Sequence, residues 1–410
     1  MTILEKSDSV GDQVGNVESQ RPKTTLPQIS PIALPPSNTR RIAGISREDL
    51  GNILGAGASA IAVTFLLFGL LAPLQGSVGF VVVTFLVFLG LYALLVSLTN
   101  PTPIVIDKVM TAILAASAAL ALAALASVVA FTLWRGRDAL VTWNLYTEDM
   151  SEAGPADPLS VGGIQHSIIG TLIIIAIAIV LTVPLGIACA VFLNETRGRF
   201  NRLVRTVVDA MSALPSILAG LFIFATFILI LGLPRSGLAA ALAVSIMMLP
   251  IIIRSADVVI RLVPGNLREA SASLGAPERR TVWHVVLPTA RPGLGTAVIL
   301  GVARGIGETA PVLLTSGFAS TLNVNPLRDP MVSLPLSVFE FVQSPQPALI
   351  ARGFATAAVL MVLVLVLFAV ARLIGGRPAG QLSSRQRKRA ESRSLRDLKR
   401  IEPDIETEQS

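Results

Sequence analysis

The stretch from Pro264 to Pro288 reads PGNLREASASLGAPERRTVWHVVLP and separates two strongly apolar runs. Asn266 followed three residues later by Glu269 predicts a helix N-terminus, because each side chain can satisfy a free backbone donor of the first turn. Gly275 predicts the left-handed turn that ends this helix, and Pro277 suits the first turn of a second one. The stretch therefore predicts a helix, a turn and a helix between two membrane spans.

The composition indicates a membrane protein. Of 410 residues, 52% are hydrophobic and 14% are charged, with a mean hydropathy of +0.70. Soluble domains carry about 25% charged residues, and helices are the usual way to satisfy every backbone polar group inside a bilayer. We therefore predict an all-α polytopic membrane protein, in contact with the lipid bilayer and with no nucleic-acid partner.

Eight apolar runs approach the roughly 20 residues needed to cross the hydrocarbon core. They cover residues 53–71, 78–98, 109–134, 168–192, 207–231, 237–253, 293–314 and 354–374. The predicted organisation is a disordered cytoplasmic tail at 1–48, a two-span hairpin at 49–100, a six-span core at 101–376 with a cytoplasmic loop at 255–290, and a basic cytoplasmic tail at 377–410. The expected fold is thus a six-span core preceded by an extra hairpin.

The distribution of Lys and Arg predicts the orientation. If the N-terminal tail is cytoplasmic, 27 of the 33 Lys and Arg residues fall on the cytoplasmic side and four on the opposite side. This agrees with the positive-inside rule. Both termini and the loop at 255–290 are therefore expected in the cytoplasm.

Charged residues inside or beside the apolar runs are candidate functional residues. Arg304 and Glu308 are four apart, so one helix face would carry both. Each costs about 2.5–3.5 kcal/mol near the middle of the bilayer, so both should face protein or water. They either line a transport path or form an ion pair that only fixes helix packing. Arg254 and Asp257, three apart, either gate that path or follow the positive-inside rule.

The order of residues in the loop resembles the "EAA loop" of ABC importer permeases. Glu269-Ala270-Ser271, then Gly275, then Leu287-Pro288, expected to close the stretch before the next apolar run, stand at the family spacing. The alternative is an ordinary amphipathic helix at the membrane surface. The resemblance implies that a short helix of this loop docks on an ATPase subunit. The coupling residues it implies are Glu269, Ala270, Ser271, Leu274, Gly275 and Ala276.

The end of the seventh run and the residue after it read ARGIGETAPVLLT, from Ala303 to Thr315, which resembles the PstA branch of this family. The resemblance implies a permease subunit that forms half of the path of an ATP-driven importer of inorganic phosphate, with Arg304, Glu308, Arg254 and Asp257 along the path. A guanidinium can bind two phosphate oxygens at once. A permease for another oxyanion, such as sulfate or molybdate, and a phosphate-sensing membrane scaffold remain alternatives.

The energy source should lie on another chain. The sequence contains no Gly-x-x-x-x-Gly-Lys-Ser/Thr loop that would cradle nucleotide phosphates. With one Cys and two His, it also offers no zinc ligand set. The chain is therefore expected to be a transport subunit rather than an enzyme, with no cofactor of its own and with ATP and Mg²⁺ bound by the partner ATPase.

The resemblance also implies the location and the partners. The expected location is the bacterial cytoplasmic (inner) membrane. The implied partners are a second, PstC-like permease, a PstB-like ATPase dimer and an extracytoplasmic, PstS-like phosphate-binding protein.

Overall fold

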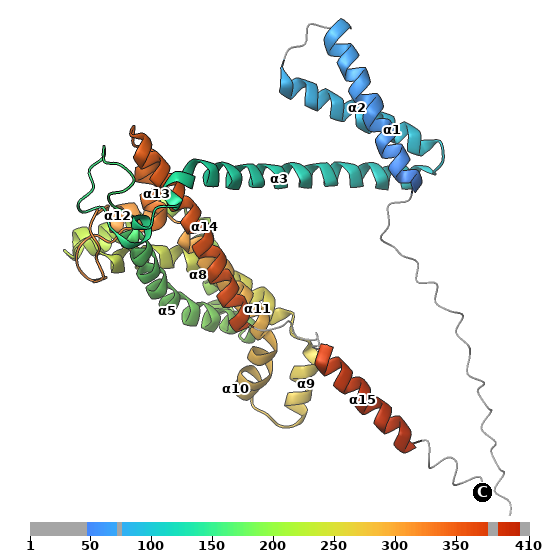
Figure 1. Cartoon of the computed structure of the whole chain (residues 1–410). Helices are drawn as coiled ribbons and strands as arrows, with labels where there is room; N and C mark the ends of the chain where they lie inside the picture. The colour runs from blue at the N-terminus through green and yellow to red at the C-terminus, as the bar shows by residue number, and fades with distance from the viewer. Residues whose placement is uncertain (1–46, 72–75, 376–383, 402–410) are drawn as a thin grey trace, which may run out of the picture. The chain divides into compact units, whose positions relative to one another are not determined.

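The computed structural model describes residues 47–71, 76–375 and 384–401 (Figure 1). In these ranges the chain is helical with connecting turns and loops, and it contains no β-strand, which confirms the all-α fold class. The predicted disordered tail at 1–48 lies outside the described residues except for its last two. The predicted basic tail at 377–410 is described only over α15 (Ser384–Ile401).

The described chain forms two compact units, residues 1–118 and 119–410, which divide within α3. The first unit contains α1 (Arg47–Leu66), the π-helical segment η1 (Leu67–Leu71), α2 (Ser77–Ser97) and the start of α3 (Thr102–Leu140). Ala56 of α1 and Tyr92 and Val96 of α2 form its buried core, against which Val109 of α3 packs. This unit contains the two spans predicted as a hairpin.

The helix α3 is longer than the predicted span at 109–134. Its 39 residues correspond to ~58 Å at 1.5 Å per residue, roughly twice the thickness of the hydrocarbon core. The apolar run is helical as expected, and the helix also includes the charged residues on both sides of it, from Asp107 to Asp138.

The second unit is built around α8 (Gly237–Arg261), the most enclosed of its membrane-length helices. In Figure 1, α5 (Gln165–Glu195), α11 (Leu287–Ile306) and α14 (Pro347–Gly375) lie together with it. Ile174 of α5, Met248 and Ile252 of α8, and Val302 and Ile306 of α11 belong to one buried cluster. The remaining helices of this unit are α4 (Asn144–Thr147), α6 (Arg199–Ala213), α7 (Ser216–Ile223), η2 (Phe224–Ile230), α9 (Gly265–Ser273), α10 (Glu278–Thr281), η3 (Val282–Val286), α12 (Ala310–Thr315) and α13 (Leu334–Val342).

Small residues bring α11 and α8 into close contact. A Cβ atom at Gly301 would lie 2.4 Å from Cγ1 of Ile252, and one at Gly305 would lie 2.5 Å from Sδ of Met248. Both distances are shorter than a van der Waals contact, so a side chain at either position would force Ile252 or Met248 to shift or the helices to separate. Membrane helices commonly approach through such residues.

The predicted fifth span is bent rather than straight. The described residues contain seven helices long and apolar enough to cross a membrane, and eight spans result only if α6 and the α7–η2 segment count as one. These two segments meet at an angle of 105°. Leu214 and Pro215 between them are extended, because a residue before proline disfavours the helical conformation. The apolar run predicted as one span at 207–231 therefore covers two helices. It begins in the last residues of the amphipathic helix α6 and continues, after the bend, through the apolar α7–η2 segment.

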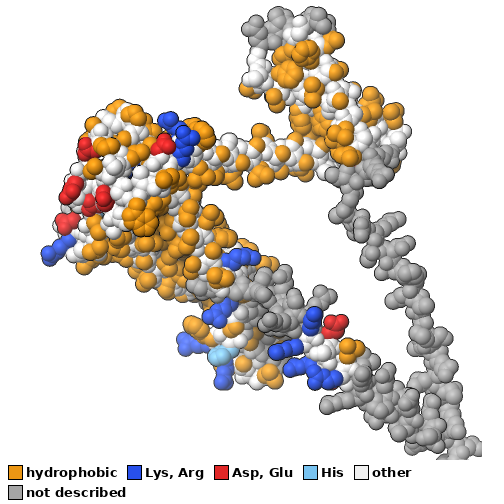
Figure 2. Space-filling view, in the orientation of Figure 1, with side chains coloured by type: hydrophobic (Ala, Val, Ile, Leu, Met, Phe, Trp, Pro, Cys, Tyr) orange, Lys and Arg blue, Asp and Glu red, His pale blue; other side chains and the backbone are white. Residues whose placement is uncertain are grey.

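Charged side chains gather at the two ends of the second unit. Figure 2 shows Lys and Arg around α9 and α10 at one end, acidic side chains together with some Lys and Arg around α12 and α13 at the other, and mostly hydrophobic side chains between them. Such a band between two polar ends suits a bilayer.

We expect the substitution Gly301→Ala to lower the thermal stability of the protein in detergent. The added methyl group overlaps Ile252, and overpacking of this kind costs about 1–3 kcal/mol. Gly55→Ala is the matched control, since its Cβ would meet no atom within 4 Å and alanine is the better helix former. Equal melting temperatures for Gly301→Ala and the parent protein would contradict the close packing of α8 and α11.

Candidate functional site

The first candidate site is the ion pair between Arg304 and Glu308. The Nη2 atom of Arg304 lies 2.8 Å from Oε1 of Glu308, and the two side chains are 52% and 5% exposed. The contact lacks hydrogen-bond geometry, so the buried Oε1 has no hydrogen-bond donor among the described residues. The site therefore combines a half-exposed guanidinium with a buried carboxylate that can still accept a hydrogen bond.

The backbone differs from the prediction at Glu308. The sequence predicts one helix face for both residues, but α11 ends at Ile306 and α12 begins at Ala310. The break falls before Pro311, which has no N–H to donate to the carbonyl of Gly307 four positions earlier. The N–H of Glu308 instead donates to the carbonyl of Gly305 at 3.2 Å. This turn keeps the carboxylate within reach of Arg304.

Arg304 lies beside the face of α11 that packs on α8. Gly301 and Gly305 point toward α8, whereas Leu300, Arg304 and Gly307 are exposed. Residues 300, 304 and 307 recur at helical spacing, so they form one stripe along α11. The exposed Leu300 and the half-exposed guanidinium of Arg304 on this stripe suit a surface that faces another helix or a transport path.

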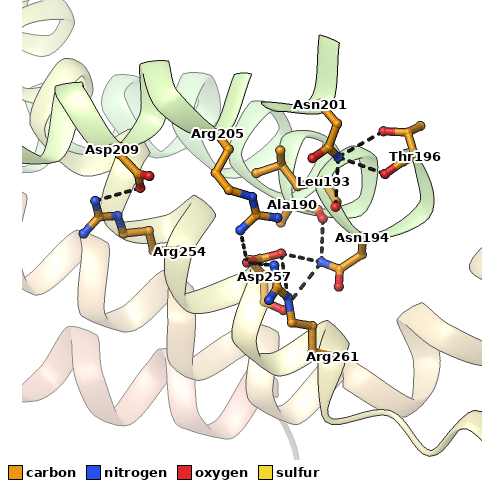
Figure 3. A network of polar contacts seen from close by, with 10 residues as sticks. All are labelled: Ala190, Leu193, Asn194, Thr196, Asn201, Arg205, Asp209, Arg254, Asp257 and Arg261. Atoms are coloured by element: carbon orange, nitrogen blue, oxygen red, sulfur yellow. Dashed lines mark hydrogen bonds and ion pairs between the residues drawn. The ribbon is translucent and has the colours of Figure 1, made fainter. Parts of the chain in front are cut away.

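Asp257 belongs to a network of polar contacts at the end of α8 (Figure 3). Its side chain is 11% exposed, and Oδ2 lies 2.8 Å from Nη2 of Arg261 and 3.3 Å from Nη1 of Arg205. The Nδ2 atom of Asn194 donates to Oδ1 at 2.7 Å. The carboxylate therefore joins α5, α6 and α8.

Arg254 and Asp257 have separate partners. Arg254 pairs with Asp209 of α6 through Nη2 and Oδ1 at 2.9 Å, with both side chains more than half exposed. Arg304 lies at the level of Met248, whose Sδ would touch a Cβ at Gly305, and Asp257 is nine residues further along α8, or about 13 Å. The four residues predicted for the path thus form three separate groups.

The loop between α8 and α11 contains the predicted helix, turn and helix. Helix α9 ends at Ser273, Gly275 has φ of +73°, and α10 begins at Glu278. A hydrogen bond of 2.8 Å between the hydroxyl groups of Ser271 and Thr281 joins the two arms. The coupling residues Glu269, Ala270, Leu274 and Gly275 are exposed, and Ser271 and Ala276 are half-buried.

Two details of the loop differ from the prediction. Asn266 does not cap α9, which begins at Gly265 after Pro264 and has no side-chain cap. The reason is that Pro264 already sets the extended geometry before the first turn. Leu287-Pro288 does not close the loop, because the chain stays helical from Glu278 through η3 to Ile306.

Sequence reasoning missed several residues that position this site. Arg268 of α9 pairs with Glu195 at the end of α5 at 2.6 Å, and Arg205 pairs with Asp257. Both pairs join residues more than 50 positions apart, so no local spacing indicates them. Arg352 of α14 is buried, and its hydrogen-bond partners, the carbonyl of Val161 at 2.7 Å and Sδ of Met150, are not acidic.

At the opposite end of the second unit, Asp149 connects its own loop to the loop between α12 and α13 that contains Leu322. Its carboxylate accepts hydrogen bonds from the backbone N–H groups of Ser151 and Leu322 at 3.0 and 2.9 Å. Partial burial raises the pKa of Asp149, but the hydrogen bonds from Ser151 and Leu322 outweigh it, so that pKa lies below its ordinary value.

Residues 182–379 match the family described as "Binding-protein-dependent transport system inner membrane component". This match and the membrane-length helices define a multi-pass permease subunit of an inner-membrane transport system.

Relatives identify the branch. "Phosphate transport system permease protein PstA 1" of Mycobacterium tuberculosis H37Rv is 39% identical over 214 residues, covering 52% of this chain and 70% of the relative. PstA of Mycobacterium leprae is 36% identical over 259 residues, covering 63% and 84%. The chain belongs to the PstA permease family. Among solved structures, an inward-facing conformation of the MetNI methionine ABC transporter is 19% identical with a TM-score of 0.42, covering 52% of this chain and 95% of that one.

The network around Asp257 generates a stability prediction. We expect Asp257→Asn to lower the free energy of unfolding by about 2 kcal/mol, the range for hydrogen bonds to charged groups, measured by thermal unfolding in detergent. Asp209→Asn is the matched control, because its pair with Arg254 is exposed and such pairs contribute about 0–1 kcal/mol. A loss for Asp257→Asn no larger than that of the control would contradict the structural role of this network.

Proposed function

We propose that this chain forms half of the translocation path of an ATP-driven importer of inorganic phosphate. The single observation that carries the proposal is the pair of Arg304 and Glu308, a half-open guanidinium beside a buried carboxylate oxygen with no hydrogen-bond donor. Membership of the PstA family and the names of the relatives at 36–39% identity support it.

The chemistry of the pair favours phosphate over other oxyanions. A guanidinium makes two parallel hydrogen bonds to a phosphate group. Monohydrogen phosphate carries a hydroxyl that can donate a hydrogen bond to the carboxylate of Glu308, whereas sulfate is fully ionised at neutral pH and has none. When the path is empty, Glu308 neutralises Arg304, so no unpaired charge is left in the membrane.

Arg254 and Asp257 would act at the cytoplasmic end of the path. Asp257 is held by three donors, so a gate at this position would open by breaking its contacts with Arg205 and Arg261. The half-exposed Arg254 could then accept an anion arriving from Arg304, at the cost of only its exposed pair with Asp209.

The loop from α9 to α10 would couple the chain to an ATPase subunit. Leu274, 88% exposed, presents an apolar side chain at the turn, and exposed Glu269 and Ala270 lie on the preceding helix. An apolar tip on a braced turn suits insertion into a groove of a partner. The ATPase dimer would bind ATP and Mg²⁺, so this chain would need no cofactor.

The remaining parts of the importer follow from this arrangement. A second, PstC-like permease would supply the other half of the path, and a PstS-like binding protein would deliver phosphate to the end with α12 and α13. The basic end with α9 and α10 would face the cytoplasm. Both termini would lie on that side too if α6 and the α7–η2 segment together make one span.

The substitution Arg304→Gln should abolish phosphate uptake. The amide keeps part of the side-chain volume but loses the charge and the bidentate contact. Uptake of radioactive phosphate into cells that depend on this importer is the measurement, with co-purification of the partner subunits as the check on assembly. Arg137→Gln, which removes an exposed cation paired with Asp138, should transport normally. Normal uptake by an assembled Arg304→Gln complex would exclude the proposed path.

The substitution Gly275→Val should uncouple transport from ATP hydrolysis. Valine is strained at φ of +73°, so the turn that presents Leu274 would change shape. We expect phosphate-stimulated ATPase activity in proteoliposomes to fall at least several-fold. Gly265→Val is the control, since that glycine has an ordinary φ and no atom within 4 Å of an added Cβ. Equal stimulation in Gly275→Val and Gly265→Val would argue against docking through this turn.

A further inference from the structure

A basic pocket lies between the α5–α6 turn and the end of α8. Its volume is about 590 Å³, within the roughly 300–1,000 Å³ of ligand sites. Four of its nine lining residues are arginines: Arg197, Arg202, Arg205 and Arg261. Asn194, Thr196 and Asn201 add further polar atoms to the wall.

Side-chain hydrogen bonds fix the turn that forms one wall of the pocket. The Nδ2 atom of Asn201 donates to the carbonyl groups of Leu193 and Thr196, both at 3.0 Å (Figure 3). Asn194 spans from the carbonyl of Ala190 to the carboxylate of Asp257. The two asparagines thereby hold the α5–α6 turn against α8, so the backbone that carries the lining arginines is fixed.

The charges around the pocket do not balance. Asp257 is the only carboxylate that contacts a lining arginine in the described part of the chain, and it is shared by Arg205 and Arg261. The neighbouring Glu195 pairs with Arg268. Across the described residues, no carboxylate lies within ion-pair distance of Arg197 or Arg202. The pocket is thus lined by four arginines, and one carboxylate is in contact with two of them.

We propose that this pocket binds a phosphate group at the end of the protein that carries the α9–α10 loop. Guanidinium groups match the paired oxygens of phosphate and bind them with charge-assisted hydrogen bonds. The group can belong to free orthophosphate or to the headgroup of an anionic phospholipid, because the pocket lies where the apolar spans end.

The pocket is distinct from the path around Arg304. Arg261 is thirteen residues beyond Met248 along α8, or about 20 Å, whereas Arg304 lies at the level of Met248. A bound phosphate group would tie the α5–α6 turn to the end of α8, three residues before Pro264 starts the loop. The proposal therefore holds whether or not Arg304 conducts phosphate.

The test uses the full chain in nanodiscs of phosphatidylcholine, with Arg304→Gln present throughout to remove the path. We expect saturable binding of radioactive orthophosphate that weakens at least tenfold in the double variant Arg197→Gln/Arg202→Gln. These two arginines have no ion-pair partner in the described chain, so their loss strands no buried charge, and the melting temperature should not change. The double variant Arg279→Gln/Arg280→Gln removes two exposed arginines from the same end and should bind within twofold of the parent.

Nanodiscs that also contain phosphatidylglycerol separate the two sources. A headgroup in the pocket would weaken orthophosphate binding at least tenfold, and phosphatidylglycerol would co-purify with the parent but not with Arg197→Gln/Arg202→Gln. Unchanged orthophosphate binding would assign the pocket to the free anion. If the pocket variant and the control variant bind orthophosphate equally and retain phosphatidylglycerol equally, the proposal is wrong.

Discussion

The contact between α8 and α11 is the constraint on which the second unit depends. It exists because Gly301 and Gly305 leave no atoms between the helix backbone and the side chains of Ile252 and Met248. This contact sets the rotation of α11, and the rotation decides that Arg304 lies on the exposed stripe. This pair of glycines therefore links the packing of α8 and α11 to the position of the Arg304 charge.

The parts of the fold that follow from local chemistry were predictable from the sequence. Hydropathy located the spans, and the left-handed turn at Gly275 was correctly predicted because only a residue without a Cβ adopts that φ easily. The bend at Pro215 and the break before Pro311 were missed, since hydropathy counts apolar residues and does not register a lost hydrogen bond.

The candidate site was predictable only in part for a different reason. Arg304 and Glu308 are close in the sequence, and their pairing survives the helix break. The partners of Asp257 and Arg268 come from other helices, Arg205 and Glu195 among them. Their identity depends on how α5 and α6 pack against α8, which spacing along one segment cannot reveal. The sequence thus located the charges and left their neighbours undetermined.

The uninterrupted helix from Glu278 to Ile306 has a mechanical consequence. Its 29 residues include both the second arm of the loop and the segment that carries Arg304. The two therefore move as one lever, with ~39 Å between Glu278 and Arg304. A rotation of about 5° at the loop would displace the far end by about 3 Å, the length of a hydrogen bond. The π-helical register of η3 and the interior Pro292 are irregularities of this helix, and it is there that it would bend.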